Sequence, residues 1–163
     1  MNGFLNGTRS LLFGCVICLV QGFVLFQVPT SRVRVEFRLA EMRDGPGLTR
    51  VEVDNPPETI YLHKEPVITG KDIIEAHVRS ESTLAGFYQV DVTFTKNGAE
   101  RMAAATEPKK GYLAVLIDGK VVAVAAIANR IYDRVTIASP MTKTEEGAEH
   151  LASMLRQGSG AGH

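Results

Sequence analysis

The most regular signal in the chain is an alternation of apolar and charged residues between positions 33 and 40. Apolar side chains alternate there with Arg34, Glu36 and Arg38, which is the period of a strand with one packed and one solvated face. Turn-forming Gly and Pro residues then separate shorter segments of the same kind. These segments predict further strands over residues 51–53, 59–64, 87–95 and 135–138.

Two short helices are predicted between these strands. Thr69 and Asp72 have the spacing of a capping box, so a helix is expected over residues 73–78, which are apolar on one side. Asn97 is a suitable N-cap because a glutamate stands three residues after it, and it predicts a helix over residues 98–106. We expect both helices to pack on the sheet.

A third helix is predicted near the C-terminus. Thr142 and Glu145 form another capping-box pattern, and Gly158 is expected to end the helix. The apolar residues of this segment recur at the spacing of one helical face. They are Ala148, Leu151, Ala152 and Leu155.

The strongest local signal is a pair of apolar runs that flank Asp118 and Gly119 within residues 112–128. Asp-Gly suits the two-residue type I′ turn of a β-hairpin. Because both runs are apolar on both faces, both strands are expected in the centre of the sheet. The order of elements predicts an α+β fold, with a mixed or antiparallel sheet, this hairpin at its centre and about three helices packed on it.

Residues 11–28 form an uncharged apolar segment, which we expect to be a transmembrane anchor or, alternatively, a signal peptide. About 18 apolar residues is the lower limit for crossing a bilayer, and a poor cleavage sequence after the segment favours the uncleaved anchor. The flanking arginines, counted alone, place the N-terminus outside. Cys15 and Cys18 lie inside the segment, so we interpret them as apolar filling rather than as a redox pair or zinc site.

The expected organisation has five parts. They are a short N-terminal region (1–10), the transmembrane or signal segment (11–28), a linker with the first strands (29–57), the α+β domain (58–157) and a flexible tail (158–163).

The balance of charges argues against nucleic acid as a partner. Lys+Arg and Asp+Glu balance at 18 each, so no net field attracts nucleic acid to the chain. Lys109 and Lys110 form a basic cluster too small to alter this. The hydrophobic fraction of 45% is that of an ordinary globular protein.

No residue is predicted to be catalytic, cofactor-binding or metal-binding. Asp118 is explained by turn geometry, and the other carboxylates stand beside caps or on solvated helix faces. Motifs for a nucleophile or a phosphate-binding loop are missing from the sequence. The histidines lack the spacing of metal ligands. They are His63, His77, His150 and His163.

Several motifs occur in an order that is typical of one family. They are residues 65–73 (EPVITGKDI), Val92-x-Phe94-Thr95-x-x-Gly98-Ala99, Thr106, residues 113–122 (LAVLIDGKVV), and Glu146-x-Ala148 before Leu151-Ala152 and Leu155-Arg156. Over residues 35–158, this pattern resembles the head subdomain of the first periplasmic domain of SecD, a membrane protein of bacterial protein export.

The resemblance implies a domain on the periplasmic side of the inner membrane, held by a single transmembrane segment with its N-terminus inside, and this outweighs the arginine count. If the segment is cleaved, the domain is expected to be periplasmic or secreted. In the family, the head contacts emerging preprotein and swings relative to a base domain as protons flow through the membrane part. Ala123-Val124-Ala125 departs from the family's Ser-Ala-Pro, and Tyr132-Asp133-Arg134 departs from its Gly-rich turn. The base domain and the proton-carrying helices are expected to be missing, so this chain is not expected to be a motor by itself.

The favoured hypothesis is a noncatalytic, membrane-tethered binding module that engages unfolded polypeptide or a translocon or envelope protein. One alternative is a structural or accessory envelope protein that reuses the fold without a role in translocation, and another is a small periplasmic enzyme. An exposed strand edge beside a shallow apolar surface would accept many sequences. Polar alternation over residues 87–95 and 132–138 predicts less covered strands, where such an edge is expected first.

Overall fold

In a computed structural model of the chain, the described residues are 32–54, 57–84, 86–107 and 111–160. None of the helices among them is long and apolar enough to cross a bilayer. Several features predicted from the sequence lie outside these residues. They are the segment 11–28 with Cys15 and Cys18, the Lys109-Lys110 pair, and His163.

Nine strands, two α-helices and two short 3-10 helices occur among the described residues. The strands are β1 (Val35–Glu41), β2 (Leu48–Asp54), β3 (Pro57–His63), β4 (Ile68–Thr69), β5 (Ile73–Leu84), β6 (Phe87–Phe94), β7 (Tyr112–Ile117), β8 (Lys120–Ala126) and β9 (Arg134–Ile137). The helices are η1 (Gly70–Asp72), α1 (Lys96–Thr106), η2 (Pro140–Lys143) and α2 (Glu145–Ser159). The α+β fold class and the antiparallel pairing agree with the prediction.

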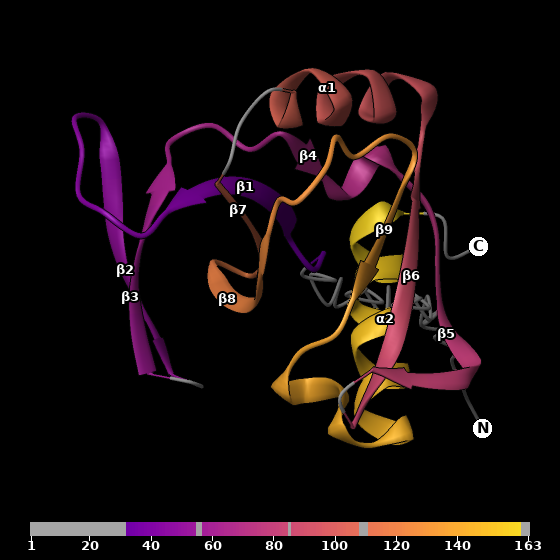
Figure 1. Ribbon diagram of the computed structural model, residues 1–163. Helices are drawn as coiled ribbons and strands as arrows, with labels where there is room; N and C mark the ends of the chain where they lie inside the picture. Colours follow the sequence, from indigo (N-terminus) through magenta and orange to yellow (C-terminus); the bar gives the residue numbers. More distant parts are fainter. Residues whose placement is uncertain (1–31, 55–56, 85, 108–110, 161–163) are drawn as a thin grey trace, which may run out of the picture. The chain divides into compact units, whose positions relative to one another are not determined.

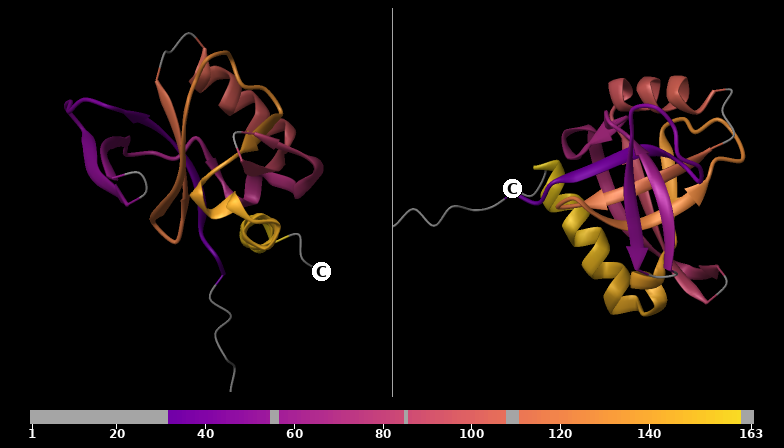
Figure 2. Two further views of the ribbon diagram at one scale, coloured as in Figure 1. Left: turned by 60° about the horizontal axis from the view of Figure 1, so that its bottom comes forward. Right: turned by 90° about the vertical axis from the view of Figure 1, so that its left-hand side faces the viewer.

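The strands form two antiparallel sheets. The larger sheet has the order β2-β3-β1-β7-β8, with β4 pairing beside this path with β1, and the smaller sheet has the order β5-β6-β9. The β2–β3 hairpin curves away from the rest of the larger sheet (Figure 1). Figure 2 (right) shows this hairpin crossing in front of β7 and β8. The larger sheet is therefore strongly curled.

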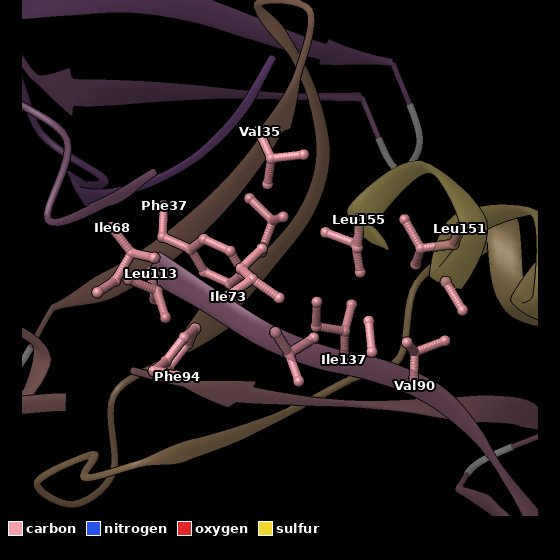
Figure 3. Packing of buried hydrophobic residues seen from close by; sticks show 14 of the residues in the cluster. Val35, Phe37, Ile68, Ile73, Val90, Phe94, Leu113, Ile137, Leu151 and Leu155 are labelled. Carbon is pink, nitrogen blue, oxygen red and sulfur yellow. The ribbon is translucent and has the colours of Figure 1, made fainter. Parts of the chain in front are cut away.

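The main hydrophobic core lies between the two sheets and includes the buried face of α2 (Figure 3). Phe37 from β1 and Phe94 from β6 meet there edge to face, with ring centroids 5.5 Å apart. The apolar residues predicted on one face of the last helix, from Ala148 to Leu155, are all buried. A second, smaller cluster, which includes Ile60 and Leu116, covers the opposite face of the larger sheet.

Asp118 and Gly119 connect β7 to β8 in a two-residue turn. Both residues have positive φ, 50° and 83°, as a type I′ turn requires, and Ile117 pairs with Lys120 on either side of them. The Asp118 carboxylate also accepts a hydrogen bond from the Arg34 backbone N–H at 2.8 Å.

We expect Gly119→Ala to destabilise the chain by about 1 kcal/mol, because an L-residue is strained at positive φ. The added Cβ would approach only the end of the flexible Arg34 side chain, at 3.4 Å, so backbone strain should account for the effect. Chemical denaturation followed by circular dichroism measures it. Asp118→Asn is the control, since asparagine accepts the same φ and the same hydrogen bond, and it should be nearly neutral. Equal stability of the wild type and Gly119→Ala would contradict this account of the turn.

The expectation that both hairpin strands are central is wrong for β8. β7 lies between β1 and β8, whereas β8 is the last strand of its sheet. Residues 121–124 of β8 are only partly buried, and Ala125 and Ala126 are exposed. An apolar pattern on both faces indicates contacts on both faces, but it does not fix how many neighbouring strands there are.

The helix predicted over residues 73–78 is also wrong, because this segment opens strand β5. The Thr69–Asp72 capping box forms, but it begins only the three-residue η1. From Ile73 the chain pairs with β6, and β-branched residues favour this extended conformation. The part of the chain that the structure describes therefore has two α-helices rather than about three.

The caps of both α-helices differ from the prediction by a few residues. Thr95, not Asn97, caps α1 by accepting a hydrogen bond from the Gly98 N–H at 3.2 Å. Thr144 caps α2, since the Thr142 side chain is buried within η2. In each case a threonine hydroxyl reaches a free N–H of the first turn.

The last turn of α2 packs directly on β1 and η1. Gly158 does not end the helix as predicted but is buried inside it, and Gly160, at a φ of 70°, forms the C-cap. A Cβ built on Gly158 would lie 2.4 Å from the Val35 Cγ2 and 3.2 Å from the Val33 carbonyl oxygen. A Cβ on Gly70 would meet the Gly158 carbonyl oxygen just as closely. Only glycine fits at this contact.

Candidate functional site

A groove of about 800 Å³ runs along β8. We call it the β8 groove. One side is formed by the β2–β3 hairpin and the other by η2 and α2. Its lining residues are Met42, Val53, Asp54, Glu58, Tyr112, Ile117, residues 120–124, residues 138–141, His150 and Met154.

The groove borders the edge of β8 rather than one face of the sheet. Val121 and Val124 pack on the smaller hydrophobic cluster, whereas Val122 and Ala123 pack on the main core. These two pairs point to opposite faces of the strand, yet all four residues line the same groove. A β-bulge near Val122, where the register with β7 shifts, interrupts the regular alternation.

The backbone on the outer edge of β8 is available for pairing. Among the described residues, β8 pairs only with β7. The Ile127 N–H donates to the Gly111 carbonyl on the β7 side at 2.8 Å. Because backbone groups alternate in direction along a strand, Ala125 also faces β7, and the N–H and C=O groups of Val124 and Ala126 face outward.

Three of the five methionines in the chain line the β8 groove. Met42 precedes the β2–β3 hairpin, Met141 lies in η2 and Met154 lies in α2, and all three are partly exposed. Methionine side chains are flexible and polarizable, so they fit surfaces of varied shape. The walls are therefore suited to side chains of different sizes.

Charged side chains in the groove lie mainly at the turn end of β8. Lys120 and Asp54 form an ion pair there with a distance of 3.5 Å between Nζ and Oδ2, and Glu58 also lines this end. Both partners of the pair are largely exposed, so it contributes little to stability. The segment of β8 after Lys120 is uncharged.

A binding edge was predicted at two places, and the first of these is residues 87–95. Most of this segment is not a sheet edge. β6 is the middle strand of its sheet, and Val90–Thr93 pair with β9 as well as with β5. Its polar residues Gln89 and Asp91 are buried, 7% and 4% exposed. The polar alternation therefore reflects a buried network and not a solvated face.

Asp91 is the centre of this network, which crosses three strands. Its carboxylate accepts hydrogen bonds from the Arg79 guanidinium on β5 at 2.8–3.1 Å and from the Thr136 hydroxyl on β9 at 2.7 Å. Burial on its own raises the pKa of Asp91, but the bonds from Thr136 and Arg79 outweigh it and hold this pKa below its usual value. The network connects all three strands of the smaller sheet.

Asp72 has a similar structural role between η1 and α1. It accepts hydrogen bonds from the Thr69 N–H and hydroxyl, both at 3.0 Å, and pairs with Arg101 at 2.7 Å. Burial opposes ionisation of Asp72, yet these partners keep its pKa lowered. Both buried carboxylates are fully engaged in holding elements together and lie outside the β8 groove.

The other predicted strand edge, residues 132–138, does contain an edge strand. β9 pairs only with β6 among the described residues, but it is four residues long. Tyr132 before it is 60% exposed, and the Arg130 guanidinium lies 5.3 Å from the centroid of its ring. This edge is much shorter than that of β8.

The histidines are dispersed, as their spacing indicates. His63 lies 3.3 Å from Glu41, His77 lies 3.5 Å from Glu75, and His150 lines the β8 groove. Among the described residues, no group of three or more His, Cys, Asp or Glu side chains is placed to hold a metal ion.

Sequence reasoning did not find the β8 groove. Its methionines come from segments far apart in the chain, and only the curl of the larger sheet brings them together. The one local signal was the apolar run of β8, which continues after the turn without a charge. That signal is equally consistent with a central strand.

Comparison with known proteins identifies the domain. The family model for the SecDF P1 head subdomain matches residues 48–160. The protein translocase subunit SecD of Aquifex aeolicus is 36% identical over 159 residues, which cover 96% of this chain and 30% of that protein. The subunit SecDF of Thermus thermophilus is 31% identical over 122 residues, which cover 72% of this chain and 16% of that protein. The chain thus spans less than a third of the length of these curated relatives.

Solved structures show the same fold. A structure described as that of a membrane component SecDF that enhances protein export has a TM-score of 0.57, with 24% identity over 78% of this chain and 64% of that one. A crystal structure of SecDF in a super-membrane-facing form has a TM-score of 0.58, with 24% identity over 78% of this chain and 19% of that one. With the family model matching most of the described residues, the chain belongs to the SecDF P1 head subdomain family.

Proposed function

We propose that this chain is a noncatalytic binding module of protein export that holds polypeptide in the β8 groove on the extracytoplasmic side of the membrane. The observation that carries the proposal is the groove itself, which combines a strand edge that no described segment pairs with, partly exposed methionines and an uncharged middle. An exported polypeptide is unfolded and varied in sequence. A surface that accepts it should therefore rely on backbone groups and adaptable apolar side chains.

Membership of the family supports the link with export. The matched relatives are subunits of a protein translocase, and one solved structure is described as a membrane component that enhances protein export. We propose that residues 11–28 tether the domain to the membrane with its N-terminus inside. The groove would then meet polypeptide that has just crossed.

Site-specific photo-crosslinking in cells tests this function. A photoreactive residue at Met141 or Met154, both in the groove, should crosslink to an export precursor of known sequence that is stalled during translocation. The matched control is the same residue at Arg50, which is exposed on β2 and outside the groove lining. We expect the groove positions to give most of the adduct.

Equal adducts at Arg50 and Met141, or none at any position, would contradict the proposal. A topology reporter fused after Gly160 tests the orientation separately. An active reporter only in the cytoplasm would place the groove on the wrong side for this role.

A further inference from the structure

We infer that the outer edge of β8 is a docking strand, onto which an extended polypeptide segment binds as an added β-strand through the backbone of Val124 and Ala126. This inference rests on the proposed function and specifies how the groove holds its polypeptide. It differs from capture by apolar side chains alone, because it assigns the contact to particular backbone groups.

The first support comes from the unused backbone. Counting back from the Ile127 hydrogen bond to Gly111, the outward groups are those of Val124 and Ala126. No described segment pairs with this edge. Val124 lies in the groove with its apolar walls, and Ala126 lies two residues beyond the groove lining. Backbone pairing there would give affinity without requiring a particular sequence.

The second support comes from the two walls. Side chains of an added strand point alternately to the two faces of the sheet. On one face they would meet Met42, Val53 and Tyr112, and on the other face Met141 and Met154. Each set of alternate side chains therefore has an apolar contact surface, and the flexible methionines allow these side chains to vary.

The third support comes from charge. The middle of the groove is uncharged, so the central residues of a bound segment should be uncharged too, because an unpaired charge would be costly there. At the turn end, Asp54 and Glu58 outnumber Lys120. A lysine or arginine at that end of the segment would be complementary to this excess.

Comparison with β2, the other edge strand of the larger sheet, favours β8 as the docking strand. β2 carries Arg50 and Glu52 side by side with its apolar residues, and these two form an exposed ion pair at 2.6 Å. Charges of this kind protect a strand edge against pairing. β8 has no charge after Lys120 and no proline, so its edge is not protected in this way.

The test uses the purified full chain and a capped nine-residue peptide of alternating valine and serine, with lysine at one end for solubility. Val124→Pro removes the outward N–H without touching a bond to β7, and an edge strand tolerates proline at such a position. Val124→Thr keeps both the N–H and the branched shape. We expect Val124→Pro to weaken peptide binding about tenfold or more, and Val124→Thr to stay within about twofold of the wild type.

Hydrogen exchange gives a second readout that does not depend on a variant folding correctly. On saturation with the peptide, the amides of Val124 and Ala126 should exchange more slowly, while the amide of Ala125 should be protected with and without peptide. A peptide of the same sequence, N-methylated at every backbone nitrogen, keeps the side chains but has no N–H donor on either edge, and it should bind much more weakly.

Equal binding of the peptide by Val124→Pro and Val124→Thr, or unchanged exchange at Val124 when the peptide is bound, would overturn strand addition. Both results are independent of the crosslinking test of the proposed function, which asks only whether polypeptide occupies the groove. Groove crosslinks without any protection of Val124 would mean that polypeptide is held through side chains.

Discussion

Replacing Gly158 by alanine is expected to destabilise the chain by about 2 kcal/mol, even though alanine is the better helix former. Helix propensity alone predicts a gain of about 1 kcal/mol, because glycine is the less favourable residue in a helix interior. The new methyl group, however, would lie 2.4 Å from the Val35 Cγ2 and close to the Val33 backbone. Overpacking of this kind typically costs about 1–3 kcal/mol and can cost more. Val35 is buried in the central part of the sheet and has little room to move.

Chemical denaturation followed by circular dichroism measures this effect, since the chain has no tryptophan. Gly111→Ala is a matched control, because a Cβ there would make only an ordinary contact, 3.6 Å from the nearest atom. In a Val35→Ala background, Gly158→Ala should cost much less, with a coupling of about 1–3 kcal/mol between the two sites. Stabilisation of the wild type by Gly158→Ala would show that α2 does not pack on β1 as described.

Asp91→Ala should destabilise the chain by about 2–3 kcal/mol, the range for losing hydrogen bonds between a buried carboxylate and charged or hydroxyl donors. Three strands lose their common partner at once, because Arg79 and Thr136 both bond to this carboxylate. Arg79 is 43% exposed, so water can solvate it in the variant and the cost stays below that of an isolated buried charge. Asp44→Ala, which removes a carboxylate from an exposed turn, should be nearly neutral.

The stabilisation that Asp91 provides should depend on pH. Its pKa is lower in the folded chain than in the unfolded chain, so its contribution is fully present above the unfolded value of about 4 and is lost as the pH falls through the folded value. Unfolding free energies measured between pH 7 and pH 2 should therefore decrease less steeply for Asp91→Asn than for the wild type. Part of the slope should remain, since the pKa of Asp72 is lowered in the same way. Identical pH profiles for the wild type and Asp91→Asn would rule out this assignment.

The local patterns of the sequence predicted the fold class and most strands, because alternation and turn chemistry act over a few neighbouring residues. They failed where tertiary contacts decide the outcome. Residues 73–78 have an apolar spacing that a helix and a strand can both satisfy, and pairing with β6 selects the strand. Polar alternation at Gln89 and Asp91 predicted a solvent-exposed strand face. Asp91 is instead buried, and its carboxylate accepts hydrogen bonds from Arg79 and Thr136.

Local sequence patterns of this kind do not predict the β8 groove. β8 is an edge strand because no described strand pairs with its outer side. Residues next to one another in the sequence do not determine the order of strands in the sheet. The methionines of the groove belong to three segments that meet only after the sheet has curled. The resemblance to the SecD head, by contrast, depends on motifs spread along the chain, and the family model confirms it over residues 48–160.

The close contact between the last turn of α2 and the start of β1 has a mechanical consequence. A Cβ built on Gly158 would lie 3.2 Å from the Val33 carbonyl oxygen, so the two ends of the described domain lie close together. A force that separates residues 32 and 160 would therefore act first on the packing of Gly158 against Val35, and through Val35 on β1 of the larger sheet.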